Sequence, residues 1–251
     1  MKNINSLSLI AMMFLLATGF QSCLVDDLFD SLEKSPEQIR QELDEKKQNM
    51  LDSGMTPLEV IDNLDSTESK ILTGLYYQGG LIIDFNELTG EGIIVSEEDL
   101  GEYEWGCHDI EIEDLVCMTS SDYQLENGES YNEGEYNSSL VLSSVCGSLE
   151  PGDPHYYKTA FQACDEYEHD GFDDWFLPGR TLLDKIEYLG IDGRYWSSTG
   201  VIDEPFYAWA VKLGNSNGCT AYETWLGTTA YNRNIKFARS RLAKVRAVRR
   251  F

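Results

Sequence analysis

Residues 171–178 read Gly-Phe-Asp-Asp-Trp-Phe-Leu-Pro, and this stretch carries the clearest fold signal in the chain. A glycine, two aspartates and a closing proline are typical of a turn, because short carboxylates accept hydrogen bonds from nearby backbone N–H groups. We therefore expect Asp173 and Asp174 to shape a turn that ends at Pro178, with a ligand-binding loop as the alternative. Trp175 is expected to be a core anchor rather than a platform for sugar rings.

The sequence on either side alternates between strand-like and helix-like segments. Apolar runs at residues 80–85 and 92–96 flank a turn and predict a β-hairpin. Residues 108–136 form an acidic insertion rich in small polar residues, which predicts a long surface loop. The mixture predicts an α+β fold, with a few helices and a mixed or antiparallel sheet. The other expected elements are helices at 137–145 (capped by Asn137), 156–167 and 180–189, and strands at 195–198, 207–213, 221–226 and 244–251.

Seven short motifs follow one another along the chain: YQGGLI at 77–82, EWGC at 104–107, ACDEY at 163–167, GFDDWFLP at 171–178, YWSST at 195–199, AWAV at 208–211 and VRAVR at 245–249. In this order they resemble the Lcl C-terminal domain, a family named after a bacterial collagen-like adhesin. The resemblance covers about residues 77–251 and implies a C-type-lectin-like domain on a bacterial surface protein. For the name-giving adhesin it implies binding to sulphated glycans, and a homotrimer is a further implication. Trp196 and Trp209 lie in these motifs and are expected in the core with Trp175.

Acidic residues dominate the composition, with 44 Asp and Glu against 19 Lys and Arg and a net charge of −25. Such a surface repels phosphates, which excludes a general nucleic-acid binder. Residues 71–157 hold 19 acids and no Lys or Arg, whereas residues 233–251 hold eight bases and no acid. We expect these bases, Arg239 and Arg241 among them, to pair within the fold. A free basic tail that binds an anionic ligand through the same two arginines is the alternative.

The N-terminus predicts a lipoprotein. In residues 1–22, Lys2 precedes an apolar run that is too short to span a membrane and right for a signal peptide, and the segment ends directly before Cys23. We expect Cys23 to carry the lipid, including palmitate, and to anchor the protein in the membrane. An ordinary cleaved signal with a chance cysteine is the alternative. Asp26 and Asp27 resemble the acidic export tag of some Gram-negative lipoproteins, so we expect the outer membrane and an outward-facing domain.

Residues 23–76 predict an acidic helical stalk between this anchor and the domain. Residues 35–38 and 56–59 each form a capping box with proline at the first helical position. Ser66 is expected to cap a third helix. The alternative is a set of helices packed on the side of the domain.

Cysteines and candidate metal ligands show no dedicated chemical motif. No Cys-x-x-Cys pair occurs, and the histidines lack the paired spacing of a zinc site. The acidic clusters lack the spaced ligands of a calcium loop, and Phe206 stands where the Glu-Pro-Asn motif of calcium-dependent lectins has an amide. We expect no cofactor or metal, with calcium as the alternative. In an exported protein, the five cysteines after Cys23 can form at most two disulfides: the candidates are Cys107, Cys117, Cys146, Cys164 and Cys219.

Three classes of function follow. A binding or adhesion module for glycan or protein agrees best with the anchor and the resemblance, and Tyr222, Trp225 and Tyr231 are its expected stacking surface. A structural or assembly component of the cell envelope, with no small ligand, is the alternative. An enzyme of the formylglycine-generating type is not indicated, because the chain shows no reactive cysteine pair, phosphate loop, nucleophile elbow or histidine-based triad. We therefore expect no catalytic residue.

Overall fold

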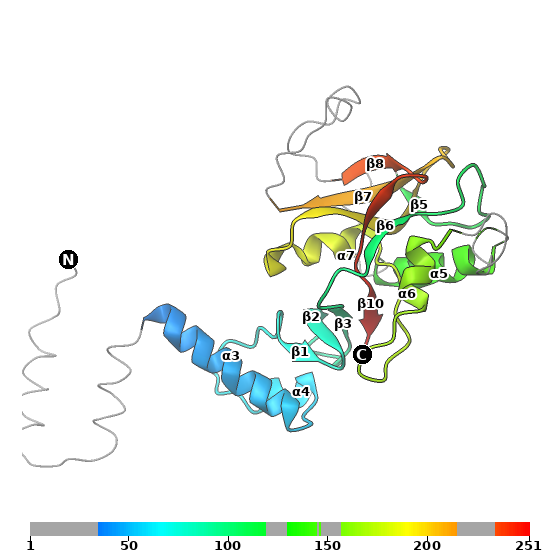
Figure 1. The fold of residues 1–251 in the computed structure, drawn as a ribbon. Helices are drawn as coiled ribbons and strands as arrows, with labels where there is room; N and C mark the ends of the chain where they lie inside the picture. The colour runs from blue at the N-terminus through cyan, green and yellow to red at the C-terminus, as the bar shows by residue number, and fades with distance from the viewer. Residues whose placement is uncertain (1–34, 119–129, 145, 147–156, 215–233) are drawn as a thin grey trace, which may run out of the picture. The chain divides into compact units, whose positions relative to one another are not determined.

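The computed structural model describes residues 35–118, 130–144, 146, 157–214 and 234–251. The chain divides into two compact units, one ending at Lys46 and one comprising Lys47–Phe251. Helix α3 (Pro36–Asp52) begins in the first unit with the expected capping box: Gln38 N–H donates to Ser35 Oγ (3.2 Å), and Ser35 N–H donates to Gln38 Oε1 (2.8 Å). All strands of the described chain lie in the second unit (Figure 1).

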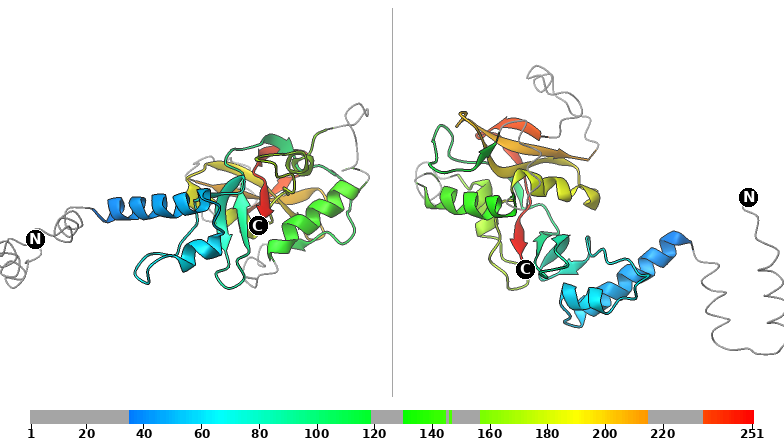
Figure 2. Two further views of the ribbon diagram at one scale, coloured as in Figure 1. Left: turned by 90° about the horizontal axis from the view of Figure 1, so that it is seen from below. Right: turned by 180° about the vertical axis from the view of Figure 1, so that it is seen from behind.

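A small antiparallel sheet joins the two ends of the domain. Its strands are β1 (Tyr76–Tyr77), β2 (Gly80–Phe85), β3 (Gly92–Val95) and β10 (Val248–Arg250), in the order β1-β2-β3-β10. The predicted hairpin is confirmed, with Phe85 opposite Gly92. The C-terminal strand β10 pairs with β3 and is seen beside it in both views of Figure 2.

A larger mixed sheet carries the rest of the domain. Along it run β4 (Gly101–Glu104), β9 (Leu242–Val245), β6 (Gly193–Val201), β7 (Tyr207–Leu213) and β8 (Asn234–Ala238), in that order. Strand β5 (Cys117–Met118) also pairs with β6. The β6–β9 and β5–β6 pairs are parallel and the others are antiparallel, so the predicted α+β class is confirmed. The strand expected at 221–226 lies outside the described residues.

Short helices pack beside the strands, and two expected starts are wrong. Asn137 lies inside α5 instead of capping a helix, because its buried side-chain amide bonds the backbone of Val116 and Ser198. Ser66 caps no helix, since residues 63–75 form turns and extended chain. Thr56 and Thr159 do form complete capping boxes. The helices are α4 (Pro57–Asp62), α5 (Ser130–Ser143), α6 (Ala160–Asp165), α7 (Arg180–Lys185) and the 3-10 helix η2 (Glu187–Leu189).

The core extends further towards the N-terminus than the sequence suggests. Trp175, Trp196 and Trp209 are buried as expected. The buried cluster around Trp196 also contains side chains from residues 47–76, which were expected to form the stalk. These residues belong to the compact unit that begins at Lys47, which agrees with the alternative of helices packed on the domain. Their buried members in this cluster are Leu51, Val60, Ile61 and Leu72.

Most bases of the C-terminal strands pair with acids of the same domain, as predicted, although Arg239 binds backbone carbonyls instead and Arg241 is exposed at a turn. Arg246 Nε and Lys244 Nζ both bind the Asp99 carboxylate, at 2.7 and 3.0 Å. Burial alone would raise the pKa of Asp99, but hydrogen bonds from Arg246, Lys244 and Tyr195 bring it below its usual value. Arg250 Nε binds Glu135 at 3.1 Å. Much of the charge asymmetry is therefore compensated internally.

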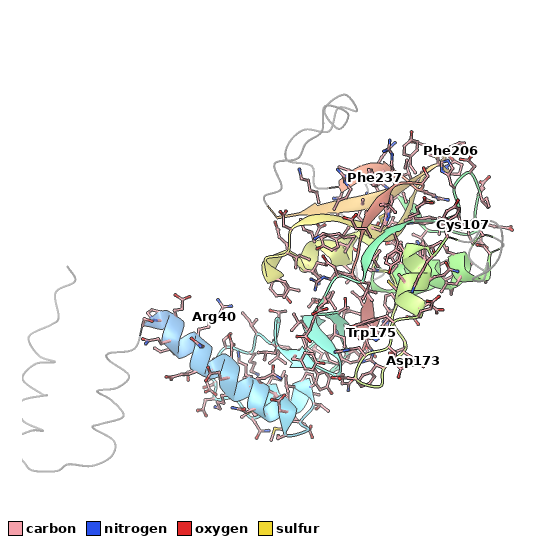
Figure 3. The ribbon with its side chains drawn as sticks, in the orientation of Figure 1. Arg40, Cys107, Asp173, Trp175, Phe206 and Phe237 are labelled. Atoms are coloured by element: carbon pink, nitrogen blue, oxygen red, sulfur yellow. A yellow bond between two sulfur atoms is a disulfide. The ribbon has the colours of Figure 1, made fainter. Side chains whose placement is uncertain are left out.

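The stretch at residues 171–178 is structural, although its bonds differ from those expected. Asp174 accepts hydrogen bonds from the Arg249 side chain, with Nη2 to Oδ2 at 3.1 Å, in place of backbone N–H groups. The Arg249 guanidinium lies 4.0 Å from the Phe172 ring centroid. Figure 3 shows Trp175 turned into the domain while Asp173 lies at its surface. The stretch thus docks on β10 through Arg249 and through the paired backbone hydrogen bonds between Phe176 and Val248.

Candidate functional site

Two loops at one end of the large sheet expose apolar side chains. The first joins β4 to β5 (residues 105–116), and the second is the β6–β7 turn. Ile110, Ile202 and Phe206 are 41%, 39% and 47% exposed. The His108 ring meets the Phe206 ring edge-on, with centroids 5.8 Å apart, so the two loops are in contact. We call these four side chains the loop surface.

A buried arginine holds both loops from beneath. Arg239 is 2% exposed, and its guanidinium carbon lies 4.1 Å from the Trp105 ring centroid. Its Nη1 donates to the carbonyls of Cys107 (3.4 Å) and Ile110 (3.1 Å), and its Nε donates to Tyr207 O (3.3 Å). Burial lowers the pKa of Arg239 to about 10. Arg239 therefore bonds within the fold, as expected, but to an aromatic ring and backbone carbonyls instead of an acid, and its burial disfavours the alternative of a ligand contact.

A disulfide braces the first loop from the side. Cys107 is bonded to Cys146, which follows α5, and Figure 3 shows Cys107 at the same end of the molecule as Phe206. Both were disulfide candidates. Cys117 and Cys164 are free thiols, so the prediction that they are disulfide candidates is wrong. Full burial raises the pKa of the Cys164 thiol far above its usual value. Cys219 lies outside the described residues.

The double variant Cys107→Ala, Cys146→Ala is expected to lose roughly 2–4 kcal/mol of unfolding free energy, because the bond closes a chain segment with a sequence separation of 39. Denaturant unfolding with and without reductant measures this. Reductant should destabilise the wild type and leave the double variant unchanged. Cys117→Ala is the control, with a loss below about 1 kcal/mol expected for a half-buried free thiol. A double variant as stable as the wild type would contradict the prediction.

Left-handed backbone is concentrated in these loops. Cys107, Asp109, Asp114 and Asp203 have φ between 50° and 65°, and they are four of the six non-glycine residues with positive φ in the described chain. Such conformations cost free energy and persist where the surroundings impose them. Here the surroundings are the Arg239 bonds and the disulfide. The loop surface is therefore carried on backbone that is fixed before any ligand arrives.

A second group of polar and aromatic side chains lies where β1 meets the turn after α6. The Tyr76 hydroxyl donates to Asp170 Oδ2 (2.6 Å) and lies 3.3 Å from His169 Nε2. The Tyr167 ring stacks on His169 at 5.9 Å. Burial, followed by the bond to Asp170, raises the pKa of Tyr76 above its usual value. These groups bind one another and fasten the turn, so we assign them a structural role.

A buried carboxyl group lies under β6. Glu133 of α5 is 5% exposed and accepts a hydrogen bond from the Thr199 hydroxyl, which in turn accepts the Arg180 N–H at 3.0 Å. Burial raises the pKa of Glu133 to about 7, although the Thr199 bond and the Arg180 charge act in the opposite direction. Its protonated form is therefore favoured by folding.

The contribution of Glu133 is expected to lower the unfolding free energy as pH rises from about 4.5 to 7, with no further change above that range. The folded state keeps the proton of Glu133 in that range while the unfolded state releases it, so ionisation costs up to roughly 3 kcal/mol. Glu133→Gln should remove this component, whereas Glu135→Gln on the exposed side of α5 should keep it. Thermal melting at a series of pH values measures the slopes. Equal slopes in Glu133→Gln and the wild type would contradict the assignment.

The remaining residues expected at the site cannot be placed with the loop surface. Cys23, Tyr222, Trp225 and Tyr231 lie outside the described residues. Arg241 is exposed at the turn between β8 and β9. Ile110 and Ile202 were not predicted from the sequence, and Phe206 was noted only as a departure from a calcium motif. Each is an apolar side chain within two residues of an acid, a pattern too common in this acidic chain to single them out.

Comparison with protein-family models finds no model that matches the chain, and comparison with curated proteins finds no significant match. Among the described residues, no group of three or more His, Cys, Asp or Glu side chains is arranged to hold a metal ion. No helix in the same part of the chain is both long and apolar enough to cross a bilayer.

Proposed function

We propose that the chain is an outer-membrane, outward-facing lipoprotein whose domain is a non-catalytic binding or adhesion module for glycan or protein. The observation that carries the proposal is the loop surface: three exposed apolar side chains on loops fixed by Arg239 and a disulfide. Binding sites are commonly placed on loops that a rigid scaffold positions. A C-type-lectin-like assignment is part of the proposal, supported by β10 returning to the first hairpin.

An array of glycans and extracellular proteins, probed with the chain lacking residues 1–22, tests the binding module. We expect at least one ligand whose signal is lost in Phe206→Ser and retained in Leu88→Ser, a matched change at a side chain that is 93% exposed in the β2–β3 turn. Binding that ignores Phe206 would move the site elsewhere. A blank array would favour a structural or assembly component of the envelope.

The proposed anchor is tested separately. Cys23→Ala is expected to abolish incorporation of labelled palmitate and to leave the protein unprocessed or soluble, because the thiol is the attachment point. Metabolic labelling followed by membrane fractionation measures both. Cys219→Ala is the matched control and should label as the wild type does. Equal labelling of Cys23→Ala and wild type would refute lipidation at this residue.

A further inference from the structure

We infer that the loop surface binds a cationic polypeptide segment that presents apolar or aromatic anchors between its lysines or arginines. This inference rests on the proposed binding function and names the class of ligand. The apolar part of the argument is the set of exposed side chains Ile110, Ile202 and Phe206. Apolar side chains that stay exposed on preformed loops are typical anchors for a partner, since little ordering cost accompanies binding.

The charge around these side chains decides the sign of the partner. The two loops carry six carboxylates within residues 107–116 and 201–206, and neither segment contains a lysine or arginine. Of the nearby bases, Lys236 binds Glu204 and Arg239 is buried. These carboxylates would attract a cationic segment and repel a sulphated glycan. The six are Asp109, Glu111, Glu113, Asp114, Asp203 and Glu204.

The same negative charge argues against a second copy of this chain as the occupant. In a two-fold symmetric contact, each loop surface would face the same six carboxylates on its partner. Like charges at close range oppose such a contact. A neutral glycan could stack on Phe206, but it would make no use of the acids. The combination of apolar side chains and predominantly negative charge is matched best by a peptide that carries both apolar side chains and positive charge.

Short fluorescein-labelled peptides provide the probe. One contains phenylalanines flanked by lysines, a second replaces its lysines with glutamates, and a third replaces its phenylalanines with serines. Fluorescence anisotropy with the chain lacking residues 1–22 should show binding of the first peptide, at least about tenfold weaker binding of the third and none of the second. The affinity for the first should fall as salt rises, because screening weakens the attraction.

Matched variants locate the site. Phe206→Ser, and separately Glu111→Gln with Glu113→Gln, should each weaken binding of the first peptide about tenfold. Changes of the same kind in the β2–β3 turn, Leu88→Ser and Glu87→Gln with Glu91→Gln, should leave it unchanged. Melting temperatures close to that of the wild type establish that the variants fold, as expected for exposed side chains.

The outcomes separate the inference from the function on which it rests. If the first peptide binds equally well to both sets of variants, its attraction is to the overall negative charge and the inference is wrong. If a glycan binds in a Phe206-dependent way and the peptide does not, the binding module stands and the ligand class is wrong. Retention on heparin well above physiological salt would also overturn the inference. Absence of both peptide and array binding would refute the proposed function itself.

Discussion

A chain shortened to residues 77–251 is expected to lose its cooperative unfolding transition. The removed segment supplies Leu51, Val60, Ile61 and Leu72 to the core cluster that contains Trp196. A fully buried aliphatic side chain contributes about 1.5–3 kcal/mol, so the four together contribute roughly 6–12 kcal/mol. This is as large as the total stability of a typical domain, about 5–15 kcal/mol.

Polar contacts would be lost in the same truncation. Gln48 holds the backbone of Tyr76 at both ends: its Oε1 accepts the Tyr76 N–H at 2.8 Å, and its Nε2 donates to Tyr76 O at 2.9 Å. The ammonium of Lys47, which is 1% exposed, donates to Ile71 O at 2.9 Å. The truncation removes these bonds together with Tyr76, so β1 keeps only Tyr77 and the pairing of Tyr76 with Leu81 at the edge of the small sheet is lost.

Thermal melting followed by circular dichroism compares residues 77–251 with residues 35–251, which retain all of α3. The longer chain should melt in one sharp transition, and the shorter one should show a broad transition or aggregate. A sharp transition for residues 77–251 within a few degrees of the longer chain would contradict the prediction. Residues 23–76 would then be a separate stalk, as their polar composition suggested.

Elements that depend on local chemistry were predictable from the sequence. The capping boxes at Thr56 and Ser35 need only a hydroxyl and a side chain three residues later, and both are present in the structure. The β2–β3 hairpin follows from two apolar runs around a turn. Trp175 and Trp196 are buried, as expected for large aromatic side chains, which gain most free energy by leaving water.

The errors arise where a distant partner decides the outcome. Asn137 has the side chain of a helix cap, yet it bonds Val116 and Ser198, 21 and 61 residues away in sequence. Residues 47–76 look polar, but most of their apolar side chains pack in or against one core, with Ile71 as an exposed exception. A sequence pattern over short helices does not reveal this. Arg239 was a candidate ligand contact because its partners in the fold, Trp105 and three backbone carbonyls, are far from it in sequence. Only the folded chain brings them together.

The last case also has a measurable consequence for the site. Arg239→Leu is expected to lower the unfolding free energy by roughly 3–5 kcal/mol, because three carbonyls lose their donor and the stacking on Trp105 is removed. Arg241→Leu, an exposed arginine two residues later, should cost less than about 0.5 kcal/mol. Denaturant unfolding of the two variants measures the difference, and equal losses would contradict the structural role of Arg239.

Arg239→Lys tests whether Arg239 acts on a ligand directly or only by holding the backbone of the loops. Lysine keeps the positive charge but lacks the planar guanidinium, which stacks on Trp105 while its Nη1 donates to Cys107 O and Ile110 O and its Nε to Tyr207 O. The domain should therefore fold with its first loop released. Hydrogen exchange at residues 107–116 should become faster, while exchange in β2 and β3 stays unchanged. Binding at the loop surface should weaken as well. The effect is indirect, because Arg239 is only 2% exposed and does not reach a ligand. If exchange in the loop is unaltered while binding is lost, Arg239 acts on the ligand directly and the loops are held by other contacts.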